Sequence, residues 1–267
     1  MSETSEPRKR QRPWDARRLL DEWLRPVWCV FKREFAGYFA TPVAYVFLVT
    51  YLVLSAVFTW GIGRLYESPQ AHLSPFFNFH PWLLLFLMPG LAMRLWAEER
   101  RSGTIELLLT LPLGISSAVV GKFLAAWAFF GVALLLTLGE WLTVAWLGGP
   151  DHGVIAVGYV ATFLLAGGYL AISACASALS KNQVIALVIG VTVCFLFMLS
   201  NFPMVVEVVD ALGIEALTEA FLQISFLTHY NDMLRGVIEA RDLVFFGTLI
   251  GVCLYVNTAL VQLKKAS

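Results

Sequence analysis

Charged residues are scarce in this sequence of 267 residues, because Asp, Glu, Lys and Arg make up only 14% of it, against about 25% in an ordinary soluble domain. The 19 basic residues balance the 19 acidic ones, so no excess of positive charge is present to attract nucleic acid. Hydrophobic residues reach 58%, above the usual value of about 45–50%. This composition indicates a membrane protein, and its long uncharged runs leave little chain for a separate water-soluble domain.

Two kinds of site motif are missing. No two of the four cysteines stand at the C-x2-C spacing of metal or thiol-redox sites, and three lie in apolar runs, where a free thiol behaves as a small hydrophobe. No G-x-x-x-x-G-K-[ST] phosphate-binding loop occurs, since Gly121 and Lys122 are followed by Phe123, and Ser116 stands where that motif needs its first glycine. We therefore expect no ATPase activity, no cofactor and no metal in this chain itself.

Six stretches are predicted to cross a membrane. A transmembrane helix needs about 20 mostly apolar residues, because every backbone N–H and C=O group must be bonded internally in the hydrocarbon layer. One shorter stretch, Pro81 to Ala97, contains Pro89-Gly90 and ends near Arg94, so it predicts a kinked span whose arginine reaches the membrane surface. The five longer runs are Val43 to Ile62, Phe123 to Leu147, Val154 to Leu179, Gln183 to Val206 and Leu243 to Leu263.

The positions of lysine and arginine predict how these spans are oriented. Sixteen of the 19 fall in the N-terminal arm, in the loops after the second and fourth spans, and at the C-terminus, whereas only Arg64, Arg235 and Arg241 fall on the opposite side. Because cytoplasmic loops retain positive charge, both termini are predicted to be cytoplasmic. Residues 1–26 then form a basic cytoplasmic arm, and residues 27–263 form the transmembrane domain.

An amphipathic helix is predicted over residues 24–39, before the first span. Apolar side chains recur along one helical face, and Thr41-Pro42 ends the helix. Aromatic rings suit the membrane interface, so this helix is expected to lie there; a simple membrane anchor is the alternative. The residues on that face are Leu24, Trp28, Phe31, Phe35, and Tyr38 or Phe39.

A second amphipathic helix is predicted in the long outer loop between the fifth and sixth spans. Its apolar residues recur at three- and four-residue spacing. It is expected either to lie on the outer membrane face or to re-enter the membrane and help close an exit path. These residues are Ile214, Leu217, Phe221, Ile224, and Leu227 or Thr228.

The loop between the second and third spans is the most informative segment. Gly103 is expected to end one helix and Thr104 to cap the next, with Glu106 in its first turn, where the helix dipole favours a carboxylate. Residues Ile105 to Leu111 then form about two leucine-rich turns before Pro112. This cytoplasmic helix is either a docking element for a partner's groove or a segment folded against the protein's own spans.

Several single residues have two interpretations each. Glu140 is the only carboxylate inside a long span, and it is either a pathway residue or a structural one that reaches interfacial water. The small residues Gly167, Ala171, Ala174 and Ala178 permit close helix approach, within one subunit or at a dimer seam. All four histidines are predicted on the outer side, where loop positions are more common than metal sites.

Six short motifs in order resemble those of type-2 ABC transporter permeases. They are FKREF (31–35), LSPFF (73–77), EERRSGTIELLLTLP (98–112), GK (121–122), ALSKNQ (178–183) and RGVIEARD (235–242). The sequence most resembles the gliding-motility-associated permease branch, which also occurs in bacteria that do not glide. The resemblance extends from about Trp28 to Leu263, and the basic arm is longer than expected.

The resemblance implies an all-α permease of six transmembrane helices in the bacterial inner membrane, with an interfacial helix, a cytoplasmic coupling helix at 98–112, and outer helices at 207–241. Its implied partners are two separate ABC ATP-binding subunits that bind ATP and Mg, a second identical or paralogous permease, membrane lipids and a periplasmic accessory protein. ATP binding would drive export of a substrate. The residues implied in contact with the ATPase are Glu98, Glu99, Arg100, Gly103, Thr104, Glu106, Leu107, Leu108, Ser180, Lys181 and Asn182.

Two functions of another class compete with export. A membrane scaffold or assembly subunit could anchor an ATPase complex without transporting a substrate. An intramembrane enzyme would need paired ionisable groups within the bilayer, and Glu140 has no evident companion there.

Overall fold

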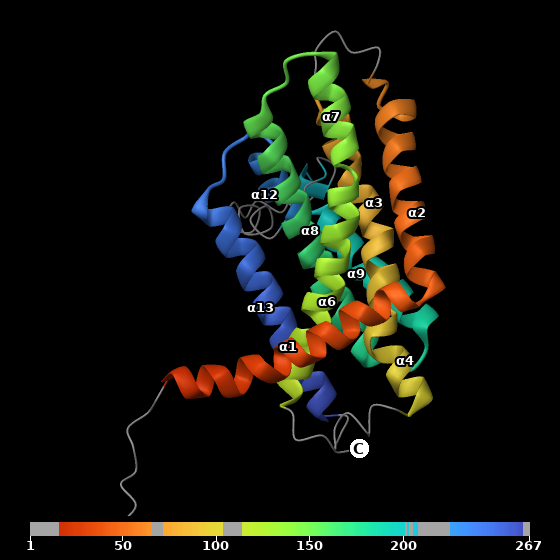
Figure 1. The fold of residues 1–267 in the computed structure, drawn as a ribbon, viewed down its shortest axis with the longest axis vertical. Helices are drawn as coiled ribbons and strands as arrows, with labels where there is room; N and C mark the ends of the chain where they lie inside the picture. Colours follow the sequence, from red (N-terminus) through yellow and green to blue (C-terminus); the bar gives the residue numbers. More distant parts are fainter. Residues whose placement is uncertain are drawn as a thin grey trace, which may run out of the picture.

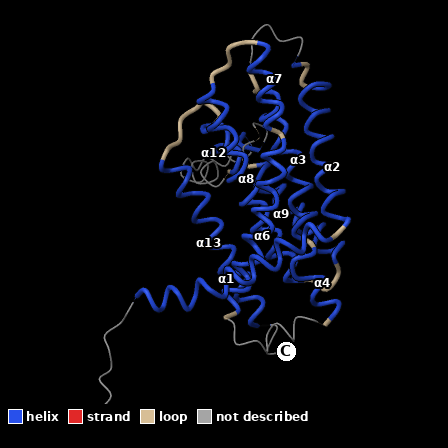
Figure 2. Tube along the Cα trace, in the orientation of Figure 1, coloured by secondary structure: helices blue, strands red, loops and turns tan. Residues whose placement is uncertain are grey.

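The protein is described here from a computed structural model, which describes residues 16–65, 72–103, 114–200, 202, 205–207 and 225–263. Every element within these ranges is a helix, and the helices form one elongated bundle (Figures 1 and 2). The α-helices are α1 (Ala16–Ala40), α2 (Pro42–Ala56), α3 (Ser74–Ala92), α4 (Arg94–Ser102), α6 (Ile115–Leu136), α7 (Leu138–Leu147), α8 (His152–Leu179), α9 (Gln183–Leu199), α12 (Phe226–Met233) and α13 (Ala240–Leu263), and a π-helix, η1 (Val57–Ile62), follows α2.

Five helical segments of the described chain are long and apolar enough to cross a membrane. Each includes most of a predicted span, so the prediction of a multi-pass all-α membrane protein is confirmed. Helix α9 covers most of the predicted fifth span but has only 17 residues, about 26 Å against a hydrocarbon layer of about 30 Å. The six-span layout therefore stays a prediction. The five segments are Pro42–Ile62, Ser74–Ser102, Ile115–Leu147, His152–Leu179 and Ala240–Leu263.

Two of these segments are each divided into two α-helices. Helix α3 continues through Pro81 and Pro89, and the break that separates it from α4 falls at Met93, a few residues after the predicted kink. The break between α6 and α7 falls at Thr137, whose hydroxyl donates to the Leu134 carbonyl at 2.7 Å. Helix α4 lies at one end of the bundle and α7 lies at the other (Figure 1). We call these the α4 end and the α7 end.

Helix α8 lies at the centre of the bundle and packs against α3, α4, α6, α9, α12 and α13. Its small residues allow this packing, because a Cβ atom on Gly167 would lie 2.9 Å from the Trp127 ring and 3.0 Å from Ile250. The predicted small-residue stripe therefore packs inside a single chain. By contrast, α2 and α13 lie on opposite sides of the bundle (Figure 1) and expose many valines, as expected of helices that face lipid.

Helix α1 crosses the α4 end of the bundle and packs along α6 (Figure 1). The predicted apolar face is only partly correct, since Leu24 and Trp28 are 49% and 56% exposed while Val27 and Val30 are buried against α6. The exposed aromatic rings stack along the helix, with 5.0 Å between the centroids of Trp28 and Phe31. The valine side of the helix thus faces the bundle, and the aromatic side is exposed at Trp28 but packs on Phe129 of α6 at Tyr38 and Phe39. Its place at the membrane interface stays a prediction. As predicted, Thr41 separates α1 from α2.

Helix α12 lies in the segment between α9 and α13 that was predicted to be on the outer side. Phe226, Tyr230 and Met233 are fully buried, and the Tyr230 hydroxyl donates to the Phe77 carbonyl at 2.9 Å. This helix therefore inserts among α8, α9 and α13 rather than lying on the surface. Leu227 and Thr228 of the predicted amphipathic helix lie in α12, whereas residues 208–224 lie outside the described residues.

Candidate functional site

The first predicted coupling segment begins on α4, which places its charged residues at the α4 end. Glu98 is exposed there, and Glu99 and Arg100 are half-buried. Gly103 ends the helix with a left-handed φ of 73°, a conformation that favours glycine, so this predicted helix end is confirmed. The remaining residues predicted for this site, Thr104, Glu106, Leu107 and Leu108, lie outside the described residues, as does the predicted helix from Ile105 to Leu111.

The second predicted coupling segment is the turn between α8 and α9. Ser180 Oγ accepts from the backbone N–H of Asn182 at 3.0 Å, and Asn182 Oδ1 accepts from that of Val184 at 2.9 Å. Asn182 thereby caps the N-terminus of α9, so this helix begins directly after the turn. Lys181 and Asn182 are exposed and so remain accessible to a partner.

Hydrogen bonds join α4 to the end of α8, directly before that turn. The backbone N–H groups of Trp96 and Ala97 donate to Ser177 Oγ at 3.1 and 3.2 Å, and Ser177 donates to the Met93 carbonyl at 3.0 Å. Arg100 donates to the Ala178 carbonyl at 2.7 Å. The two predicted coupling segments are therefore held in a fixed relation at one end of the molecule.

Ser177 is a site residue that the sequence did not indicate, because it lies within a run of small residues typical of helix packing. We expect Ser177→Ala to lower the free energy of unfolding by about 1–3 kcal/mol, since two buried N–H donors at the start of α4 lose their acceptor. Equilibrium unfolding in mixed micelles measures this change. Ser173→Ala is a matched control, because Ser173 is equally buried on α8 but donates to the Tyr169 carbonyl of its own helix. Equal losses in both variants would contradict this role of Ser177.

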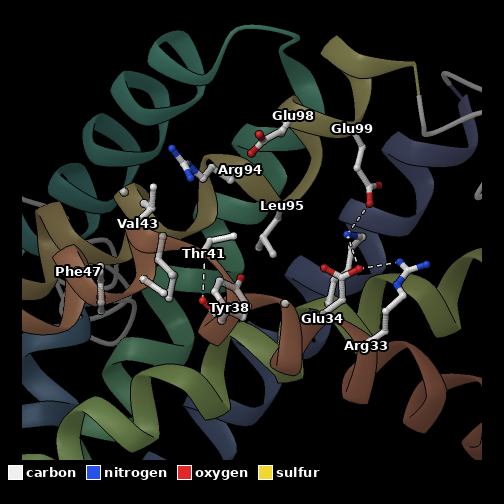
Figure 3. A pocket seen from close by; sticks show the side chains of 15 residues that line it. Arg33, Glu34, Tyr38, Thr41, Val43, Phe47, Arg94, Leu95, Glu98 and Glu99 are labelled. Carbon is white, nitrogen blue, oxygen red and sulfur yellow. Dashed lines mark hydrogen bonds and ion pairs between the residues drawn. The ribbon is translucent and has the colours of Figure 1, made fainter.

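Lys122 is the centre of a charged cluster that joins three helices. Its side chain is only 4% exposed, and its Nζ lies 2.7 Å from Glu99 on α4 and 3.2 Å from Glu34 on α1. The same ammonium lies 5.6 Å from the centroid of the Trp96 ring, within range of a cation–π interaction. We call Lys122, Glu34 and Glu99 the Lys122 cluster. In Figure 3 the two carboxylates point toward each other from α1 and α4.

The charges of neighbouring residues keep Glu34 ionised. Burial on its own would raise the pKa of Glu34, but the Lys122 ammonium and the Arg33 guanidinium, which donates to it at 2.6 Å, bring its pKa below the ordinary value. The hydrogen bond to Glu34 likewise raises the pKa of Arg33. The contact between α1 and α6 therefore contains an ionised carboxylate, that of Glu34, at neutral pH. Sequence reasoning placed Lys122 among exposed loop cations, because only the packed structure shows that a lysine at the start of an apolar run is buried.

A cavity of about 380 Å³ adjoins the Lys122 cluster. Figure 3 shows its wall, where α1, the start of α2, and the α3–α4 junction meet. One part of the lining is apolar and includes Val43, Phe47 and Leu95, and the other part is charged. The charged lining residues are Arg33, Glu34, Arg94, Glu98, Glu99 and Lys122.

Glu140 lies apart from these groups, toward the α7 end. Ser55 on α2 donates a hydrogen bond to its carboxylate at 3.0 Å, and the Glu140 side chain is half-buried. This contact joins α7 to α2, close to where α2 changes into the π-helix η1. Whether Glu140 also contributes to a pathway stays a prediction.

Two of the histidines are buried, in contrast to the loop positions expected for them. His80 donates from Nδ1 to the Phe76 carbonyl at 2.6 Å, so its Nε2 can accept from the Tyr51 hydroxyl at 3.0 Å. His229 Nδ1 lies 2.7 Å from Asp242 and joins α12 to α13. Within the described ranges, no three His, Cys, Asp or Glu residues lie close enough together to hold a metal ion.

Residues 86–259, more than half of the chain, match the family described as ABC-2 family transporter protein. The chain belongs to this family. It is accordingly a multi-pass membrane permease subunit of an ABC transporter, of a type that is not itself the ATPase. A comparison with curated proteins gave no match.

Proposed function

We propose that this ABC-2 permease is the membrane-spanning subunit of an ATP-driven exporter in the bacterial inner membrane, with its α4 end in the cytoplasm. Arg94, Arg100, Arg101 and Lys181 all lie at the α4 end, which supports this orientation through the retention of positive charge in the cytoplasm. Both termini would then be cytoplasmic. The resemblance to the gliding-motility-associated branch adds an expectation of export.

Coupling to separate ATP-binding subunits is proposed to occur through residues 98–112 and 180–182. The observation that best supports this proposal is the set of hydrogen bonds from Ser177 and Arg100 that fixes α4 against the end of α8. A partner that pushed on one segment would move the other with it. The Lys122 cluster would pass the same displacement to α1 and α6, because its ammonium pairs with carboxylates on α1 and α4.

The complete transporter is proposed to contain two ATP-binding subunits, which bind ATP and Mg, and a second permease that is identical or paralogous. Rocking of the permease halves on ATP binding would then move a substrate outward. Helix α12, which is inserted among three membrane helices, belongs to the outer segment implied to line the exit. A periplasmic accessory protein would act at the α7 end.

The test of this proposal is a double variant, Leu107→Asp with Leu108→Asp, made in the full chain. If these leucines enter a groove of the ATP-binding subunit, two buried carboxylates will abolish the contact. We expect the ATP-binding protein and its ATPase activity to disappear from the complex purified in mild detergent, while the permease stays in the membrane at wild-type abundance. Mass spectrometry of the purified complex identifies the missing subunit.

The matched control is Leu263→Asp, because Leu263 is 69% exposed at the end of α13 and lies outside both proposed coupling segments. This variant is expected to retain the ATP-binding subunit. Unchanged co-purification and ATPase activity in the double variant would contradict coupling through 98–112. An intact ATPase complex that moves no substrate in vesicles would instead favour a scaffold.

A further inference from the structure

The cavity beside the Lys122 cluster has the features of a lipid headgroup site. We propose that it binds the phosphoethanolamine headgroup of a phospholipid from the membrane leaflet at the α4 end. Arg94 would bind the phosphate, Glu98 the ammonium, and the apolar wall at Val43 and Phe47 the first carbons of the acyl chains. This inference is independent of ATP coupling.

Arg94 is the one of the three cations lining the cavity that pairs with no group in the described part of the chain. Arg33 and Lys122 are paired with carboxylates, whereas Arg94 makes no hydrogen bond or ion pair among the described residues, and its Nε atom is buried without an acceptor. A buried donor without an acceptor is costly. A guanidinium binds phosphate oxygens through two parallel hydrogen bonds, so a phosphate in the cavity would satisfy this side chain. In Figure 3 the Arg94 guanidinium points away from the Glu34 and Glu99 carboxylates.

The balance of charge around the cavity favours a zwitterionic ligand over an anionic one. Three cations and three carboxylates line it. The two positive charges of Arg33 and Lys122 balance the two negative charges of the carboxylates in the Lys122 cluster. What remains is Arg94 and, one helical turn later on α4, the exposed carboxylate of Glu98, which makes no ion pair in the described part of the chain. One free cation and one free anion match a headgroup that carries one phosphate and one ammonium.

Two glycines keep the cavity open. Gly37 on α1 and Gly90 on α3 both line it, and a Cβ atom built on either would meet nothing within 4 Å. Side chains at these positions would project into free space, because the helices are not in close contact there. A larger residue at Gly90 should therefore fill the cavity without disturbing the packing of α3.

The cavity also lies at the depth that a phospholipid headgroup occupies. On one side are the exposed apolar residues of α2 and α3, including Val46 at 64% and Phe86 at 61% exposure. On the other side is the charged helix α4, with α1 lying across the bundle (Figure 1). A lipid phosphate lies at such a boundary between apolar and charged surfaces, and Val43, which lines the cavity, is itself 43% exposed.

The test is native mass spectrometry of the full-length protein in delipidated detergent micelles, titrated with dioleoyl phosphatidylethanolamine. We expect Arg94→Gln to weaken binding of the first lipid about tenfold, the loss of one charge-assisted contact. Gly90→Leu is expected to weaken it at least as much by filling the space. Leucine also suits a helix better than glycine does, so this variant keeps the test valid if Arg94→Gln fails to fold. Arg101→Gln, an exposed arginine of the same helix that does not line the cavity, should bind like the wild type.

Two further titrations identify the ligand. Glu98→Gln should weaken binding of phosphatidylethanolamine several-fold and leave that of phosphatidylglycerol unchanged. Soluble glycerophosphoethanolamine should bind far more weakly than the lipid, because it lacks acyl chains to contact Val43 and Phe47. The proposal is overturned if Arg94→Gln and Gly90→Leu both bind the first lipid normally, if phosphatidylglycerol binds as tightly as phosphatidylethanolamine, or if the soluble headgroup binds as tightly as the lipid.

Discussion

Replacement of Lys122 by methionine is expected to lower the free energy of unfolding by about 3–5 kcal/mol, because it removes a buried ammonium that pairs with two largely buried carboxylates. Glu34 and Glu99 are only 22% and 19% exposed, and each lies within 3.2 Å of the Lys122 ammonium. Without that ammonium, only the Arg33 guanidinium offsets the effect of burial, and we expect the pKa of Glu34 to rise toward its ordinary value. Equilibrium unfolding in mixed micelles measures the first effect, and its dependence on pH measures the second.

How the stability of the protein depends on pH follows from the lowered pKa of Glu34 in the wild type. Since the pKa of Glu34 is lowered by folding, its contribution to stability is present above the unfolded pKa and is lost as the pH falls through the folded value. In Lys122→Met the pKa of Glu34 is lowered less by folding, because only Arg33 still favours the ionised form. Stability of the variant should therefore decline less on acidification than that of the wild type.

A second substitution separates lost pairing from lost packing. In Lys122→Met with Glu99→Gln, the carboxylate that lies nearest to the replaced ammonium is neutral as well, so part of the lost stability should return. Lys32→Met is the control, because Lys32 is exposed on α1 outside the Lys122 cluster, and a change within about 0.5 kcal/mol is expected there. A double variant no more stable than Lys122→Met alone would show that the ammonium has another role.

The features predicted correctly are those that short segments determine by themselves. Apolar runs fixed the spans, because their backbone must be bonded internally in lipid whatever surrounds them. Gly103 and Thr41-Pro42 ended helices as predicted, since a left-handed φ and a missing N–H are local constraints. The burial of charged residues was more difficult to predict, because the sequence does not distinguish Lys122, which is buried in an apolar helix, from a lysine in a loop.

The features that were missed depend on contacts between distant segments. Ser177 and Met93 are 84 residues apart, and Tyr230 and Phe77 are 153 residues apart, so no local pattern indicates these bonds. The valine side of α1 was missed for a similar reason. Aromatic periodicity identified a side of that helix that is only partly exposed, whereas Val27 and Val30 are buried where Gly121 on α6 lacks a side chain. The charged cavity is lined by residues of five helices, α1, α2, α3, α4 and α6, so no single segment of the sequence indicates it.

The close approach of α1 to α6 makes Gly121→Val the second strongly destabilising substitution. A Cβ atom at this position would lie 2.8 Å from the Val30 Cβ and 3.0 Å from the Val27 carbonyl oxygen. The backbone atom cannot move without moving α1, so valine should force the helices apart. We expect a loss near the upper end of the range for overpacking, about 3 kcal/mol, measured by unfolding in mixed micelles.

The cause of that loss can be identified by a matched glycine on the same helical segment. Gly139 on α7 is exposed, and a Cβ atom there would meet nothing within 4 Å, so Gly139→Val should leave stability within about 0.5 kcal/mol of the wild type. Separation of α1 from α6 also draws Glu34 away from Lys122, the residue next to Gly121. The lowered pKa of Glu34 should therefore return toward its ordinary value in Gly121→Val and stay low in Gly139→Val. If Gly121→Val is as stable as the wild type, α1 does not rest on α6 as the structure places it.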